Sequence, residues 1–307
     1  MIFFLYAVTV FAWGLSWYGV QLQLGVVAPE VSVFYRFLLS AAVMYGYCRF
    51  TGRDIDFRPR DHLWVAAQGL FLFCTNFYLV YLGAQYLPSG LISTLFSLVI
   101  VMNVIGGALF LHNRLEARMV IGAIFGIGGI AIVFWPELAA FDLHQGGAKG
   151  MILVLCGTMS AATGMLISAL NQRRGLGVVR TNTMGMAYGA LFCFIFCVAH
   201  GAEFRIEWTV SYIGALLFLS IISTVIAFAT YLTLVGRIGP ERASYSSVLF
   251  PMVALAVSTW LEGFQWTSGA VVGIACILIG NLFVLTPPAL LARLTGRAVR
   301  PIATTPE

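Results

Sequence analysis

Residues 210–235 read VSYIGALLFLSIISTVIAFATYLTLV, a stretch without a single charged side chain. A helix needs about 20 mostly apolar residues, each rising about 1.5 Å, to cross the hydrocarbon core of a bilayer. Hydrocarbon offers no water to the backbone, so every N–H and C=O must be hydrogen-bonded inside the segment. This stretch therefore predicts a membrane-spanning α-helix.

Nine further stretches of similar length and composition predict nine more spans. Away from the first few residues of each stretch, Arg36 is the only charged residue in any of them. Only 9% of the 307 residues are charged and 60% are hydrophobic, whereas a soluble domain carries about 25% charged residues. We predict an all-α membrane protein of ten transmembrane helices, with no room for a soluble catalytic domain. The predicted spans are residues 2–24, 30–48, 63–82, 86–111, 118–136, 149–170, 181–200, 210–235, 240–261 and 264–286.

The basic residues outside the spans are distributed unevenly between the two sides of the membrane. Of the 17 Lys and Arg residues, fourteen fall on the side of the termini, and only Lys149 and Arg205 fall on the other. The positive-inside rule then places both termini in the cytoplasm and predicts a multi-pass protein of the bacterial inner membrane. This distribution explains the net charge of +5 without a nucleic-acid partner. The N-terminal residues MIFFLYAV predict an uncleaved first span.

Landmarks recur at about half the chain length, which indicates an internal duplication. Pairs of matching landmarks are Tyr81 with Tyr231, Pro88 with Pro240, and Gly122-x-x-x-Gly126 with Gly269-x-x-x-Gly273. Five spans are an odd number, so two copies must insert in opposite orientations, a recurrent plan of secondary transporters. The predicted units are residues 1–137, residues 138–286 as an inverted copy, and a cytoplasmic tail, residues 287–307. A duplicated scaffold without transport activity is the alternative.

Several short motifs give the chain a family resemblance. The stretches are Ala12-Trp13-Gly14, Tyr35-Arg36-Phe37-Leu38-Leu39, Tyr86-Leu87-Pro88-Ser89-Gly90, and Arg114-Leu115 with Gly122. The chain resembles the drug/metabolite transporter superfamily in its EamA-type ten-helix branch, and within it the bacterial aromatic amino-acid exporters. The resemblance implies export of amino acids with aromatic or other apolar side chains. Two departures weaken it in the first half, where Asn113 replaces a common acidic residue and the counterpart of Pro251 is missing.

Polar and aromatic side chains at helical spacing predict a central substrate cavity. Intramembrane polar groups usually face the interior of a bundle, and aromatic faces attract both apolar groups and an ammonium. Such a lining suits a small amphipathic solute. Packing between helices or a place in the interfacial belts are the alternatives for each residue. The candidates are Trp13, Trp17, Gln68, Thr75, Tyr78, Ser93, Ser97, Ser160, Thr163, Thr224, Tyr231, Ser244 and Ser247.

Two further residues stand out inside the spans. Arg36 is costly at its depth, and an intramembrane charge is by default a functional candidate. It could attract an anionic group of the solute, or it could cap carbonyls or reach the interface, and the structural role is favoured. Pro251 removes a backbone hydrogen bond from span nine and predicts a kink, which could be a hinge or static. No Asp or Glu lies deep inside a span, so proton coupling has no obvious carrier.

Other classes of protein find little support in the sequence. It contains no HExxH, GxSxG or CxxC motif, so we predict no catalytic residue, metal site or cofactor. The glycines of spans five and ten predict close helix packing, within the chain or in a homodimer. The alternatives left open are an exporter of drugs, nucleotide-sugars or organic anions with the same fold, an ion channel, and an intramembrane enzyme.

Overall fold

The computed structural model describes residues 1–111, 117–135, 146–238, 243 and 246–286, and the regular elements in these ranges are all helices. Eight helical runs are long and apolar enough to cross a membrane. Two shorter apolar helices, α7 (Ala117–Val133) and α14 (Ser246–Leu261), lie where spans five and nine are predicted. The prediction of an all-helical membrane protein is confirmed.

The ends of the helices lie within a few residues of the predicted ones, and the predicted start of span nine lies outside the described residues. In the first half of the chain the helices are α1 (Ile2–Gln21), α2 (Pro29–Phe50), the continuous run α3 (Pro59–Gln68), η1 (Gly69–Thr75) and α4 (Asn76–Ala84), then α5 (Ser89–Phe96), α6 (Val99–Leu111) and α7. In the second half they are α9 (Gly146–Arg173), α10 (Val178–Ala199), the run α11 (Val210–Leu217), η2 (Phe218–Ile226) and α12 (Ala227–Ile238), then α14 and α15 (Ser268–Leu285).

Two of the spans contain π-helical segments that the sequence did not predict. The segment η1 lies in the third span of the chain, and η2 lies in the eighth. A π-helix bonds residue i to i+5, is rare, and is often found at functional sites. Because the segments are interior to long apolar stretches, hydrophobicity alone gives no sign of them.

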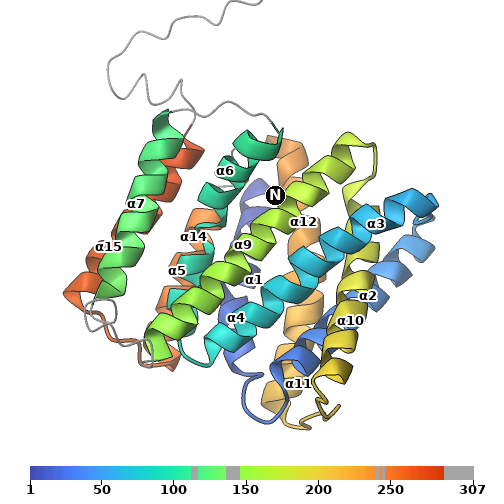
Figure 1. The fold of residues 1–307 in the computed structure, drawn as a ribbon, viewed down its shortest axis with the longest axis horizontal. Coiled ribbons are helices and arrows are strands. Elements are labelled where there is room, and N and C mark those ends of the chain that lie inside the picture. The colour runs from blue at the N-terminus through green and yellow to red at the C-terminus, as the bar shows by residue number, and fades with distance from the viewer. Residues whose placement is uncertain (112–116, 136–145, 239–242, 244–245, 287–307) are drawn as a thin grey trace, which may run out of the picture.

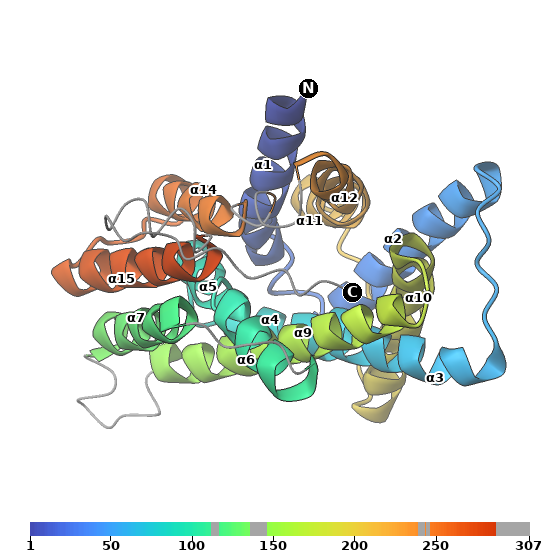
Figure 2. The same cartoon turned by 90° about the horizontal axis from the view of Figure 1, so that it is seen from above.

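The helices pack in matched pairs (Figures 1 and 2). The helices α7 and α15 lie side by side at one end of the bundle, and α2 packs against α10 at the other. Between these ends, α1 contacts η2, α12 and α14, while α9 contacts η1, α4 and α5. The helices α5 and α14 also pack together. Several contacts of α1 with helices of the second half thus resemble those of α9 with helices of the first half.

Glycines allow α7 and α15 to approach closely. A Cβ atom at Gly122 would lie 2.5 Å from the carbonyl oxygen of Gly280, and one at Gly129 would lie 2.5 Å from that of Gly273. The two contacts run in opposite directions along the two helices, so the pair is antiparallel. These glycines thus face each other within one chain, and a homodimer through the outer faces of α7 and α15 stays a prediction.

A carboxylate joins α14 to α5 at the end of the bundle opposite Met1 (Figure 1). Glu262 accepts hydrogen bonds from the backbone N–H of Ser89 at 3.1 and 3.2 Å, and a third from the Ser89 hydroxyl. The N-cap residue of α5, Pro88, provides no side-chain cap. Glu262 therefore satisfies a free N–H at the start of α5, where a negative charge is also favourable.

Replacing Glu262 with alanine is expected to lower the free energy of unfolding by about 1 kcal/mol, the usual loss when a cap is removed. Thermal unfolding in detergent measures the change. Glu203→Ala is the control, because Glu203 pairs with Arg205 at an exposed site, and such pairs contribute little. Equal melting temperatures for the two variants would contradict the capping role of Glu262.

Candidate solute-binding site

A cavity of about 340 Å³ lies between α2, α10 and the η2–α12 run. Its volume is within the usual range for small-molecule sites, about 300–1,000 Å³. Exposed Arg53, in the loop after α2, lines it, and so does deeply buried Thr224. The cavity therefore reaches from the end of the bundle that carries most arginines into the interior. Its lining is Met44, Tyr47, Arg53, Val179, Asn182, Met186, Thr224, Val225, Phe228, Ala229 and Thr233.

Arg36 lies beside Thr224 in the interior. The guanidinium is 3% exposed, and its Nη2 donates a long hydrogen bond of 3.4 Å to Thr224 Oγ1. Its Cζ lies 4.4 Å from the ring centre of Phe77 and 5.5 Å from that of Phe37. The other two guanidinium nitrogens, Nε and Nη1, have no hydrogen-bond partner among the described residues. A buried cation in this state is costly, because one long hydrogen bond, two aromatic rings and the neighbouring Tyr81 hydroxyl replace only part of its lost hydration.

A second group of buried polar side chains adjoins Arg36. The hydroxyl of Tyr81 lies next to the guanidinium and donates a 2.6 Å hydrogen bond to Gln23 Oε1. Ser40 Oγ donates to the carbonyls of Arg36 (2.8 Å) and Ser220 (3.1 Å). The amide nitrogen of Gln23 and the hydroxyl of Ser220 are buried and unpartnered in the described part of the chain. The centre of the bundle thus holds polar groups with unused hydrogen-bonding capacity.

The π-helical segments present backbone carbonyls to neighbouring helices. In η2, the carbonyl of Ser223 accepts a 3.2 Å hydrogen bond from Trp13 Nε1, and the carbonyl of Leu219 accepts one of 2.7 Å from Thr224 Oγ1. In η1, the carbonyl of Phe71 accepts a 2.7 Å bond from Ser160 Oγ of α9. Trp13 of α1 and Ser160 of α9 therefore make matching contacts to the two segments. The hydrogen bond that Thr224 donates to the carbonyl of Leu219 orients its hydroxyl oxygen to accept the hydrogen bond from Arg36.

Aromatic side chains form a cluster behind the cavity. The ring of Trp13 lies 5.1 Å from Tyr231 and 5.7 Å from Phe228, which lines the cavity. The ring of Trp17 lies 4.9 Å from Phe96, and both tryptophans contact Phe250 at 6.3–6.4 Å. Trp13, Trp17 and Tyr231, which the sequence singles out, thus lie in one cluster.

The other predicted cavity residues have varied surroundings. Gln68 lies behind the cavity wall and bonds to Asn182, which lines the cavity. Ser97 accepts a hydrogen bond from Asn281, and Thr163 donates to the carbonyl of Met159 in its own helix. Tyr78 packs edge-on against Phe196 at 6.2 Å.

Five predicted positions complete this comparison. The hydroxyl of Ser93 is buried without a partner in the described ranges. Thr75 and Ser247 are half-buried, and Ser244 lies outside the described residues. Pro251 is buried within α14, which continues through it as a helix. Thr224 is a predicted cavity residue that lines the cavity, whereas the other predicted residues within the described ranges are not part of its lining.

Sequence reasoning missed Asn182, Arg53, Tyr81 and Gln23 as members of this region. Asn182 is the second residue of predicted span seven, and a polar residue so close to a span end gives only a weak signal. Tyr81 was used only as a landmark of the repeat. Arg53 and Gln23 lie at or beyond the span ends, where polar residues are common and carry no such signal.

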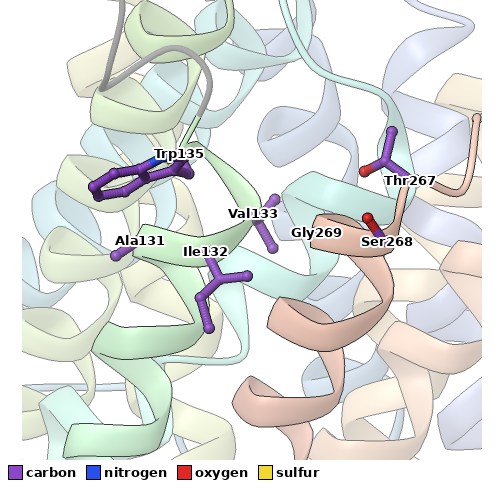
Figure 3. A pocket seen from close by; sticks show the side chains of 7 residues that line it. All are labelled: Ala131, Ile132, Val133, Trp135, Thr267, Ser268 and Gly269. Carbon is purple, nitrogen blue, oxygen red and sulfur yellow. The ribbon is translucent and has the colours of Figure 1, made fainter.

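A second hollow lies at the opposite end of the bundle, between α7 and α15 (Figure 3). It measures about 510 Å³, and its lining includes Val133, Trp135, Thr267 and Ser268, without a charged side chain. The hydroxyl of Thr267 accepts a hydrogen bond from the N–H of Ala270 and so caps α15. This apolar surface offers few groups to orient a polar solute, and the cavity beside Arg36 is the better candidate.

A membrane-spanning helical bundle with a solute-sized cavity, one of whose lining residues accepts a hydrogen bond from a buried arginine, has the architecture of a membrane transporter. The chain belongs to the EamA-like transporter family, which matches residues 1–135 and 148–286. The family resemblance seen in the sequence motifs is therefore confirmed. The gap between the two matched stretches falls where the sequence predicts the boundary between its halves.

Relatives of similar length carry transporter names. An uncharacterized transporter of Archaeoglobus fulgidus is 24% identical over 91% of this chain and 96% of its own length. The uncharacterized transporter YoaV of Bacillus subtilis is 21% identical over 88% and 93%. A probable amino-acid metabolite efflux pump of Salmonella typhimurium is 23% identical over 90% and 92%. One crystal structure aligns with a TM-score of 0.66 at 16% identity, covering 95% of this chain and 97% of the other, and shows the same fold.

Proposed function

We propose that the protein is an inner-membrane carrier that exports small amphipathic metabolites, chiefly aromatic or other apolar amino acids, by alternating access. The observation that carries this proposal is Arg36, a buried guanidinium with two unpartnered nitrogens beside Thr224 of the cavity. Such a group binds a carboxylate through charge-assisted hydrogen bonds. The carboxylate of the solute would supply the missing counter-charge, which favours binding over the structural role expected for Arg36.

The surroundings of Arg36 suit a solute with an apolar part. Phe37 and Phe77 flank the guanidinium, and Phe228, Met44 and Met186 line the cavity. Aromatic faces can also attract the ammonium of an amino acid. The name of the Salmonella relative, a probable amino-acid metabolite efflux pump, agrees with this substrate class.

Alternating access has support in the packing. The matched helix pairs, the π-helical segments in the third and eighth spans, and the two family matches agree with two inverted five-helix units. By the positive-inside rule the cavity opens to the cytoplasm, and both termini lie there. At the outer end, Glu262 holds α14 to α5, and Gln21 Nε2 donates a 2.7 Å hydrogen bond to the carbonyl of Leu87. These contacts are what a cytoplasm-facing carrier requires.

Counterflow in proteoliposomes tests the substrate class. Vesicles are loaded with one unlabelled candidate, and labelled phenylalanine is added outside, with and without a pH gradient. We expect protein-dependent accumulation without a gradient when an apolar amino acid is inside, and a further gradient effect would reveal proton coupling. No accumulation with any amino acid, together with exchange of a drug cation or a sugar phosphate, would overturn the substrate class.

Replacing Trp13 with alanine is expected to reduce phenylalanine counterflow about fivefold, because each lost aromatic contact contributes about 0.5–1.5 kcal/mol. Trp17→Ala and Tyr78→Ala are expected to impair transport as well, while membrane insertion stays intact. Trp260→Ala is the matched control, since Trp260 is 82% exposed on the outside of the bundle. Normal transport by the first three variants would exclude both the aromatic cluster and Tyr78 from the proposed site.

A further inference from the structure

We infer that Asn182 is a specificity-determining residue of the cavity, which donates a hydrogen bond to an oxygen of the solute distinct from the carboxylate held by Arg36. The inference rests on the proposed function and narrows its substrate class. It favours aromatic acids that carry an additional oxygen, as tyrosine does, over those that lack it, as phenylalanine does.

Three buried amides form a chain that ends at the cavity. Asn171 Nδ2 of α9 donates to Gln68 Oε1 of α3 at 2.9 Å, and Gln68 Nε2 donates to Asn182 Oδ1 of α10 at 2.9 Å. Asn171 and Gln68 are fully buried, and Asn182 is 6% exposed. Each amide has one accepting oxygen and one donating nitrogen. Since the oxygen of Asn182 is used by Gln68, its NH₂ group is the part left for the cavity.

The three amide groups could be oriented in two ways, as observed or with every oxygen and nitrogen exchanged. The two orientations differ in which buried atom is left without a hydrogen-bond partner. As it stands, the unpartnered buried atom of the chain is the oxygen of Asn171. If all three amides were turned over, the NH₂ group of Asn171 would be buried without an acceptor. Buried donors without partners are rarer than carbonyl oxygens without partners. The observed direction is therefore favoured, and it keeps a donor at the cavity wall.

Asn182 and Thr224 line the same cavity from different helices, α10 and η2. Thr224 accepts a hydrogen bond from Arg36, so a cation lies directly behind one wall of the cavity. The other wall presents the amide donor of Asn182. A solute with a carboxylate and a second acceptor oxygen can use both. Gln68 does not line the cavity and acts as a positioning residue, because it holds the oxygen of Asn182 away from the solute.

The test compares tyrosine and phenylalanine uptake by proteoliposomes, since the two solutes differ by one oxygen. We expect the wild-type protein to prefer tyrosine by about 3- to 10-fold, the range of one neutral hydrogen bond. Asn182→Leu, which is similar in shape without polar atoms, should bring the ratio close to one. Gln68→Leu should lower the ratio too, although it leaves the cavity lining unchanged. Asn182→Ala gives a second test if the leucine variant accumulates poorly.

Thr183→Val is the matched control, because Thr183 is a buried polar residue of the same helix that bonds to the carbonyl of Val179 and does not line the cavity. Its uptake ratio should equal that of the wild type. A wild-type ratio of one, or a ratio unchanged by Asn182→Leu and Asn182→Ala, would overturn the inference and leave the proposed function standing. Failure of the wild type to transport either amino acid would overturn the proposed function and this inference with it.

Discussion

Replacing Arg36 with glutamine is expected to lower phenylalanine transport at least about 30-fold and to raise the melting temperature of the solute-free protein. Truncating one partner of a buried, hydrogen-bonded charge pair typically costs 2–5 kcal/mol, and about 2 kcal/mol corresponds to 30-fold. The gain in stability has a separate cause. An unpaired buried cation carries a desolvation penalty of several kcal/mol that a neutral amide avoids.

Counterflow and thermal unfolding on the same preparations check both parts of this result. Arg36→Lys is the companion variant, because it keeps the charge but loses the planar, multidentate donor group. It should transport less than the wild type and gain no stability. A glutamine variant that transports normally and melts at a lower temperature would assign Arg36 a structural role.

The second large effect concerns the contact between α7 and α15. Gly129→Ala should destabilise the protein by about 1–3 kcal/mol, the usual cost of overpacking, because its Cβ would lie 2.5 Å from the Gly273 carbonyl oxygen and 2.7 Å from Ile277. A Cβ atom at the neighbouring Gly128 would meet no other atom within 4 Å. Gly128→Ala should therefore stabilise the helix by up to about 1 kcal/mol through helix propensity alone.

Thermal unfolding in detergent distinguishes the two glycine variants, since the melting temperature should fall for one and stay equal or rise for the other. Both substitutions add the same methyl group to the same helix, so differences in propensity cancel. A fall of equal size in both would mean that α7 and α15 do not pack at Gly129 as described.

The helices could be predicted from the sequence because the bilayer imposes a single strong requirement. A stretch such as 210–235 must satisfy its backbone internally, whatever it packs against. The π-helical segments could not be predicted, because their backbone geometry depends on contacts from other helices, such as the bond from Ser160 to the carbonyl of Phe71. The amino-acid composition of the segment itself does not reveal such a contact from another helix.

The candidate site was predictable only in part. Helical spacing placed Trp13 and Tyr231 among the candidates, and the structure shows that their rings pack together from two different helices. Spacing cannot tell a side chain that lines a cavity from one that lies one residue behind it. Gln68 illustrates this limit, because its amide reaches the cavity through Asn182. The surroundings of Arg36 likewise come from η2 and α4, which are distant in the sequence.

The buried guanidinium also has a consequence for how the chain is made. The helix α2 has the lowest mean hydropathy of the eight long spans, 1.3, and an arginine at the centre of a span costs about 2.5–3.5 kcal/mol on insertion. The chain is synthesised from its N-terminus, whereas η2, whose Thr224 accepts the hydrogen bond of Arg36, comes much later in the sequence. A nascent chain that ends after α7 therefore contains Phe37, Phe77 and Tyr81, which lie around this cation, but lacks Thr224, which accepts its hydrogen bond. The insertion cost of Arg36 is therefore offset by a hydrogen bond only after the second half of the chain has been made.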